Sequence, residues 1–305
     1  MNMDAAALIS GLKKGDIKSL ARCISLAENN RGPFEEILFA LEHRPEIPVA
    51  GITGPPGAGK SSLVNALTHS YISEGKKVAI IAVDPTSPFN YGSLLGDRLR
   101  MADLYLTPGV YIRSMASRGS LGGLAPKIHE TVDLIKNAGF DLILIESVGV
   151  GQSEVEIAGI ADTTVVVMVP EAGDEVQTMK SGVMEIADIF VVNKADREGA
   201  DAFSGHLRRL SAQRQTEYWN IPVILTEAHL NKGADTLAEA ITTHHQLNLS
   251  KEKQLDLMAE KATHLVREAL ARKVQVQDIR TRLQARVQDA SFNLYRFTRE
   301  ILEQA

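Results

Sequence analysis

A lysine and two serines follow closely spaced glycines in the segment GITGPPGAGKSSLV, and these residue types at this spacing bind a polyphosphate. The glycines allow the backbone N–H groups to face the phosphates, Lys60 reaches the β- and γ-phosphates, and the Ser61 hydroxyl can bind Mg²⁺. A purely structural glycine turn is the alternative, but the position between an apolar stretch and a helix-compatible one disfavours it. We therefore predict a nucleotide-binding loop formed by Gly54, Pro55, Pro56, Gly57, Ala58, Gly59, Lys60, Ser61 and Ser62.

A second polar motif, VVNKAD, ends another apolar stretch and predicts which base is bound. The Asp196 carboxylate can accept two hydrogen bonds from guanine, whereas adenine has neither donor on that edge. Asn193 suits the other edge of the base, and the aliphatic part of Lys194 can lie along it. A backbone N–H near Glu227 and Ala228 can donate to the guanine carbonyl. Taken alone, the motif also fits a solvated strand end; downstream of a phosphate-binding loop it favours GTP and GDP as ligands.

Three carboxylates follow apolar stretches or lie close behind them. Glu146 ends the apolar run in DLILIESVGVGQSE, Asp84 ends another run, and Asp97 lies in the polar segment after it. Carboxylates brought to a phosphate-binding loop usually serve Mg²⁺, directly or through water. We predict that Glu146 organises Mg²⁺ and the attacking water, with Ser61, Asp84 and Asp97 as further metal ligands, and that the Gly149 N–H contacts the γ-phosphate. For Glu146 the alternative is a surface carboxylate, and for either aspartate it is a pairing with a neighbouring arginine.

The elements that must position these groups are short runs rich in valine and isoleucine, separated by helix-compatible stretches. This alternation predicts an α/β fold with a mostly parallel central sheet flanked by helices. Ligands bind at the carboxyl ends of the strands in such a sheet, where the motifs lie. The expected strands are Pro48–Thr53, Val78–Val83, Leu142–Ile145, Thr164–Val169, Ile189–Val192 and Pro222–Thr226.

Both ends of the chain lack such runs and have helical apolar spacing instead. We predict an N-terminal helical extension over residues 1–45, a nucleotide-binding domain over 46–245 and a C-terminal helical extension over 246–305. One apolar face of the C-terminal extension contains Leu265, Ala269 and Leu270. That face either packs on the domain's own surface or forms a dimerisation arm.

The composition excludes several classes of protein. The 305 residues have a net charge of −5, which argues against nucleic-acid binding. The single cysteine, Cys23, is expected to be a buried, inert thiol. No segment resembles a signal peptide or a membrane span, so we expect a cytoplasmic protein. The adjacent His244 and His245 are interpreted as a solvated helix end.

The motifs together resemble a known family. The segments GPPGAGKSS, AVDPTSPFNYGSLLGDRLRM, ESVGVGQSEVEIAGIAD and PEAGDEVQTMKSGVMEIADIFVVNKAD are similar to those of the methylmalonyl-CoA mutase-associated GTPases, the MeaB-like family. These proteins were formerly called LAO/AO or arginine/ornithine transport system ATPases or kinases. The resemblance covers roughly residues 45–235.

The resemblance implies a P-loop GTPase domain with helical extensions, a homodimer formed through the C-terminal one, and Mg²⁺ with GTP or GDP as ligands. It also implies a partner, an adenosylcobalamin-dependent acyl-CoA mutase, whose cofactor loading and protection are coupled to GTP hydrolysis. An additional family switch corresponds to PEAGDEVQTMKSG, with Asp174, Gln177 and Lys180, for which a surface turn is the alternative. The chain lacks a DxHxxG string, so we expect no cobalamin site in it.

Three other functions are weighed against this one. A small-molecule kinase would need an acceptor pocket, for which no motif is apparent. A binding switch would hydrolyse GTP only when a partner supplies a residue. A metallochaperone-type GTPase would have a histidine- or cysteine-rich metal motif, whereas the eight histidines here are scattered.

Overall fold

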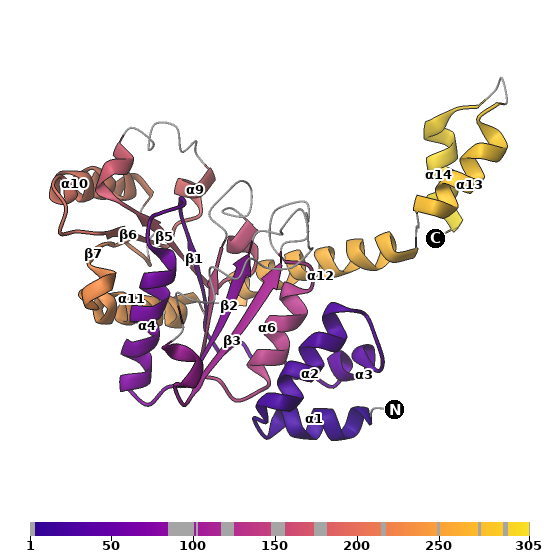
Figure 1. Cartoon of the computed structure of the whole chain (residues 1–305). Helices are drawn as coiled ribbons and strands as arrows, with labels where there is room; N and C mark the ends of the chain where they lie inside the picture. The colour runs from indigo at the N-terminus through magenta and orange to yellow at the C-terminus, as the bar shows by residue number, and fades with distance from the viewer. Residues whose placement is uncertain are drawn as a thin grey trace. The chain divides into compact units, whose positions relative to one another are not determined.

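The computed structural model describes residues 4–84, 101, 103–116, 125–147, 156–173, 182–214, 218–248, 251–273, 276–288 and 292–304 (Figure 1). The chain divides into two compact units, Met1–Gln254 and Leu255–Ala305. Within the described ranges, no helix has the length and apolar character needed to cross a membrane.

Unit 1 is built on one sheet in which every adjacent pair of strands is parallel, in the order β3-β2-β4-β1-β5-β6-β7. This confirms the predicted α/β class. The central strand β1 lies between β4 and β5, and its residues are buried on both faces, as expected for a parallel sheet covered by helices. The strands are β1 Val49–Thr53, β2 Val78–Asp84, β3 Val110–Ala116, β4 Leu142–Glu146, β5 Thr163–Met168, β6 Ile189–Asn193 and β7 Val223–Thr226.

Helices cover both faces of the sheet (Figure 1). On one face, α4 and α11 pack against alternate strand residues such as Ile52 and Leu144. On the other face, α2 and α6 pack against the intervening strand residues, such as Ile143 and Ile145 of β4. The helices of unit 1 are α1 Ala5–Lys13, α2 Ile17–Glu28, α3 Phe34–Phe39, α4 Lys60–Ser73, α6 Ile128–Lys136, α9 Gly182–Glu185, α10 Ala200–Ser211 and α11 Ala234–Asn248, with 3-10 turns at Leu104–Leu106, Ile157–Gly159, Pro170–Gly173, Ala212–Arg214 and Ala228–Leu230.

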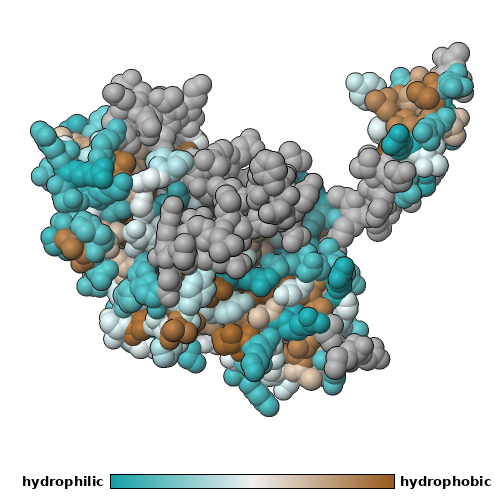
Figure 2. Space-filling model, in the orientation of Figure 1, coloured by the Kyte–Doolittle hydropathy of each residue, from teal (hydrophilic) through white to brown (hydrophobic). Residues whose placement is uncertain are grey.

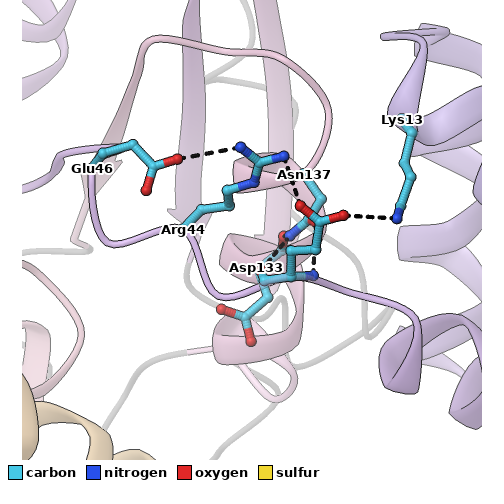
Figure 3. Close-up of polar contacts among 6 residues, drawn as sticks. Lys13, Arg44, Glu46, Asp133 and Asn137 are labelled. Carbon is cyan, nitrogen blue, oxygen red and sulfur yellow. Dashed lines mark hydrogen bonds and ion pairs between the residues drawn. The ribbon is translucent and has the colours of Figure 1, made fainter.

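The N-terminal helices α1–α3 are joined to α6 by a polar cluster (Figure 3). The Asn137 side chain accepts from Glu42 N at 3.0 Å and donates to Glu42 O at 3.0 Å. The Glu42 carboxylate also pairs with Lys13 at 2.9 Å and with Arg44 at 2.9 Å. The amide therefore fixes the backbone after α3, while the exposed ion pairs add little to stability.

Cys23 lies in α2, within the core between the N-terminal helices and α6. Its side chain is buried, and this burial raises the pKa of the thiol to about 11 because the thiolate loses its hydration. The predicted burial of the thiol is confirmed, and the raised pKa fits the prediction that it is inert.

Helices α12 Lys251–Lys273, α13 Val276–Arg286 and α14 Leu294–Gln304 make up the C-terminal part of the chain, as the apolar spacing predicted. Figure 2 shows hydrophobic residues on the surface of the α13–α14 part of unit 2. Unit 2 is a small helical body with its own contacts; its buried residues include Phe297.

Strand β3 was not predicted. It is an edge strand paired only with β2 in the described sheet, and its residues are mostly half-buried. Arg113, in its middle, forms an ion pair with Glu28 of α2. An edge strand needs no continuous apolar run, which is why VYIRSMA gave no strand signal.

Candidate functional site

The phosphate-binding loop lies between the carboxyl end of β1 and the first turn of α4. Two of its glycines occupy positions that no other residue fits. Gly54 has φ +138° and a Cβ there would lie 2.1 Å from the Val167 carbonyl oxygen. Gly59 has φ +87°, and its Cβ would lie 2.3 Å from the Asn193 amide nitrogen. The glycine pattern is therefore required by the close approach of β5 and β6 to the loop.

Lys60 begins α4, and its side chain turns back into the loop. The Nζ atom donates to the carbonyl oxygens of Gly54 at 2.9 Å and Pro55 at 3.1 Å, and the residue is 7% exposed. An ammonium held at the loop among neutral carbonyls can transfer these bonds to the charged oxygens of a polyphosphate, which are stronger acceptors. The geometry fits the predicted role of Lys60.

Glu146 and Ser61, which are 85 residues apart, meet in space. Glu146 ends β4 directly beside Ile52 of β1, and its Oε1 atom accepts from the Ser61 hydroxyl at 2.6 Å. A hydroxyl and a carboxylate are oxygen ligands of the kind Mg²⁺ prefers, so these two residues fit a site for that ion.

The other predicted metal and switch residues are described in part or not at all. Asp84 ends β2, whose residue Ala82 pairs with Glu146, so its backbone lies at the same edge of the sheet. The Asp84 side chain is outside the described residues, and so are Asp97, Gly149, Asp174, Gln177 and Lys180. Among the residues that are described, no three His, Cys, Asp or Glu side chains cluster as metal ligands.

Asn193, predicted to contact the base, also has a role within the protein. It ends β6, is 2% exposed, and donates to the Ala58 carbonyl at 2.9 Å. Its oxygen accepts from Thr226 Oγ1 at 3.1 Å and from Ala228 N at 3.2 Å. The amide therefore joins the phosphate loop to the segment after β7, and its contact with the base stays a prediction. Only the tertiary arrangement could assign Thr226 to this network.

The other predicted base-binding residues follow the carboxyl ends of β6 and β7. Lys194 has φ +57°, and its Nζ donates to the Gly57 carbonyl at 2.8 Å, so its side chain extends across the phosphate loop. Asp196 is exposed, which leaves it accessible to a ligand. The Glu227 N–H donates to the Lys232 carbonyl at 3.1 Å, and the Ala228 N–H to Asn193. The predicted N–H contact with guanine thus has to compete with existing bonds.

His244 and His245 do not form a solvated helix end, so that interpretation is wrong. They are 3% and 7% exposed and lie in the last turns of α11, on the face that also buries Leu237 and Ile241. The 3–4 residue spacing of these four positions was the signal that could have revealed their burial. They lie near the start of β5, away from the phosphate loop.

Comparisons with known proteins identify what this chain is similar to. The model of the family described as methylmalonyl Co-A mutase-associated GTPase MeaB matches residues 20–279. A Pyrococcus abyssi protein whose name assigns it to the GTPases is 46% identical over 279 residues, covering 88% of this chain and 86% of the relative. The mouse methylmalonic aciduria type A homolog, mitochondrial, is 34% identical over 273 residues, covering 80% and 64%. The crystal structure of an LAO/AO transport system kinase has a TM-score of 0.71 and 25% identity, covering 98% and 96%.

Proposed function

Because this chain belongs to the family of methylmalonyl-CoA mutase-associated GTPases of the MeaB type, we propose that it is a Mg²⁺-dependent GTPase that serves an adenosylcobalamin-dependent acyl-CoA mutase. GTPase activity follows from the family and from relatives with that name. The proposal concerns the metal, the residues that act and the partner.

The contact between Ser61 and Glu146 is the observation that supports the proposed chemistry. Ser61 lies in the first turn of α4, beside the loop that takes the phosphates, and Glu146 approaches it from β4. Bound Mg²⁺ would neutralise the phosphate charge. Ser61 would be a direct ligand of the ion, and Glu146 would hold a coordinated or attacking water. Lys60 would bind the β- and γ-phosphate oxygens, and the Gly149 N–H would contact the γ-phosphate.

The metal and switch assignments beyond this pair stay proposals. Asp84 and Asp97 would complete the Mg²⁺ environment through carboxylate oxygens. Asp174, Gln177 and Lys180 would form the segment that reports the nucleotide state to a partner. Asp196 would accept from guanine, with Lys194 along the base.

The proposed partner function is a gate. The chain would bind the mutase and couple GTP binding and hydrolysis to loading and protection of the cobalamin cofactor. The support is the family description, which names a mutase, and a mouse relative named for methylmalonic aciduria. The partner would supply the cobalamin site.

Reconstitution with a purified acyl-CoA mutase and adenosylcobalamin tests the gate. We expect the mutase to change the GTP hydrolysis rate, and cofactor transfer, followed by cobalamin absorbance, to require GTP. The matched control is Lys60→Ala, which should bind the mutase without supporting transfer. A hydrolysis rate that the mutase does not change, together with no complex in sedimentation, would remove the mutase from the proposal.

Two alternative functions, a small-molecule kinase and a metallochaperone-type GTPase, predict different experimental results for the same purified protein. A small-molecule kinase, suggested by the name of the LAO/AO transport system kinase, would move the γ-phosphate to an acceptor rather than to water. Mass spectrometry of the products separates the two. A metallochaperone-type GTPase would bind a transition metal, and the described residues offer no cluster of three or more suitable side chains.

We also propose that the chain forms a homodimer through its C-terminal extension. The GTPase domain would begin near residue 46, after the N-terminal helices, and the C-terminal extension would begin near residue 246. Four large apolar side chains of α12 are exposed on the helix surface, which is what a helix face covered by another chain would require. Sedimentation velocity at micromolar concentration would contradict this by giving a monomer of 33.2 kDa. The exposed positions are Leu255, Met258, Val266 and Leu270.

A further inference from the structure

Two buried hydroxyl groups meet directly behind the phosphate-binding loop. Thr53 is the last residue of β1 and is 0% exposed; Ser147 follows the last residue of β4 and is 2% exposed. The Ser147 hydroxyl donates to Thr53 Oγ1 at 2.9 Å, and the Ser147 N–H donates to the Ile52 carbonyl at 3.0 Å. Each of these residues is adjacent in sequence to part of the proposed site: Gly54 follows Thr53, and Glu146 precedes Ser147.

Glu146 and Ser147 point to opposite faces of the sheet, because successive side chains of a strand alternate. Leu144 packs in the core on the α4 side, whereas Ile143 and Ile145 pack on the α6 side. Glu146 accordingly faces α4, where it contacts Ser61, and Ser147 faces the other side, where it contacts Thr53. The carboxyl end of β4 is therefore held from both faces.

We infer that Thr53 and Ser147 are positioning residues for GTP hydrolysis. Their hydrogen bond fixes the end of β4 against the end of β1, and this sets the place of the Glu146 carboxylate relative to Ser61 and the phosphate loop. Neither hydroxyl needs to touch the nucleotide. The inference rests on the proposed role of Glu146 in organising Mg²⁺ or water.

The physical consequence follows from what each substitution leaves behind. Removing one hydroxyl deprives the other, buried one of its partner and loosens the only side-chain bond described between these two strand ends. A carboxylate that is displaced by a fraction of an ångström still binds but no longer organises water in the reactive geometry. The turnover number should therefore change more than nucleotide affinity.

Steady-state hydrolysis of GTP by the full chain tests the inference, with Mg²⁺ varied. For Ser147→Ala and for Thr53→Val we expect kcat to fall about 10-fold, while GDP affinity changes less than about 2-fold. The Mg²⁺ concentration for half-maximal rate should rise. Both variants remove the same hydrogen bond, so their effects should not add. The kcat of the double variant should be about that of the slower single variant. Ser147→Thr keeps the hydroxyl and should recover most of the rate.

Ser204→Ala is the matched control. Ser204 is a buried serine of α10, 1% exposed, whose hydroxyl donates to the Asp201 carbonyl at 2.9 Å. It should lose stability without loss of kcat. A folded Ser147→Ala with the wild-type kcat and Mg²⁺ dependence would overturn the inference, as would an equal loss of kcat in Ser204→Ala.

The variant Glu146→Gln separates this inference from the function it rests on. If Glu146→Gln hydrolyses GTP at the wild-type rate, the proposed role of Glu146 fails, and the inference fails with it. If Glu146→Gln is impaired and both Ser147→Ala and Thr53→Val are not, only the inference fails. Two independent substitutions keep the test decisive when one of them does not fold.

Discussion

The two ends of the parallel sheet both carry polar residues, but these residues bond in different ways. At the carboxyl end, bonds run from strand ends to a loop or a helix: Asn193 of β6 bonds to the phosphate loop and to the segment after β7, and Glu146 of β4 bonds to α4. At the amino end, bonds run between strands and one helix. There Asp162 accepts from Val49 N at 2.8 Å and Asp188 accepts from Thr164 N at 2.9 Å.

The same aspartates face the buried histidines of α11. His244 contacts the Thr163 hydroxyl through Nδ1 at 2.8 Å and Asp188 through Nε2 at 3.3 Å, while Trp219 packs beside its ring. The His245 ring lies 3.6 Å from Asp162. These contacts hold a helix on the start of the sheet.

The difference shows that a polar side chain contributes to stability or to ligand binding according to the end of the sheet at which it lies. At the amino end, carboxylates satisfy strand N–H groups that would otherwise be buried without partners, so their contribution is to stability. At the carboxyl end, loops diverge from the strands and leave Lys60 and Glu146 beside a ligand-binding loop. Substitutions at the carboxyl end should therefore change function, and substitutions at the amino end should change stability.

The largest expected effect at the carboxyl end is that of Lys60→Ala. Removing the ammonium takes away a charged donor to the phosphates, and we expect GTP hydrolysis to fall by about 100- to 1,000-fold. Phosphate release measures the rate, and thermal unfolding measures stability, which should change little. The control is Lys14→Ala, at an exposed lysine after α1. Wild-type turnover by Lys60→Ala would refute the active-site assignment.

Asp196→Asn should have the next largest effect. The carboxylate that accepts two hydrogen bonds from guanine becomes an amide, which can donate to the extra carbonyl of xanthine. We expect GTP to bind about 100-fold more weakly and xanthosine triphosphate to bind better. Calorimetric titration with both nucleotides and with ATP measures the change. Asp201→Asn, at an exposed position of α10, should leave all three affinities unaltered; unchanged preference in Asp196→Asn would move base recognition elsewhere.

The smallest effect is expected at the amino end, where stability should depend on pH through His245. Burial lowers the pKa of His245 from its usual 6.5, because an imidazolium loses hydration; Lys136 and His244 act in the same direction, and Asp162 opposes them. The unfolded chain then binds more protons than the folded one, so stability is full above about pH 6.5 and falls as the pH falls below it. We expect Tm to drop there by a few degrees, about 2–4 °C for each kcal/mol lost.

His245→Gln tests the origin of this slope. The variant should have a flatter dependence of Tm on pH between about 7 and 5, with GTP turnover at pH 7 retained. The control, His206→Gln, replaces an exposed histidine of α10 and should leave the slope unaltered. A slope that persists in His245→Gln would assign the pH dependence to other groups.

Much of the fold could be predicted because its signals are local. The apolar runs of β1, β2, β4, β5 and β6 are largely continuous, since a strand buried on both faces needs apolar residues at successive positions. The edge strand β7 also has an apolar run, over residues 223–225. Strand β3 could not be predicted, because Arg113 and Ser114 in an edge strand look like loop residues. The burial of His244 was missed for a related reason: its partners, Thr163 and Asp188, are remote in sequence.

The sequence by itself determined the α/β class and the family and predicted the phosphate-binding loop and the guanine motif, because each depends on residue types at short spacings. The tertiary structure alone decided which side chains meet. It placed the Asn193 amide against the phosphate loop, Ser61 against Glu146, and Ser147 against Thr53. These pairs are 135, 85 and 94 residues apart. Their contacts depend on strand order, register and the alternation of side chains across the sheet, which no short segment specifies. The acid at the end of β4 could be recognised from its motif, but the hydroxyl pair behind it required the fold.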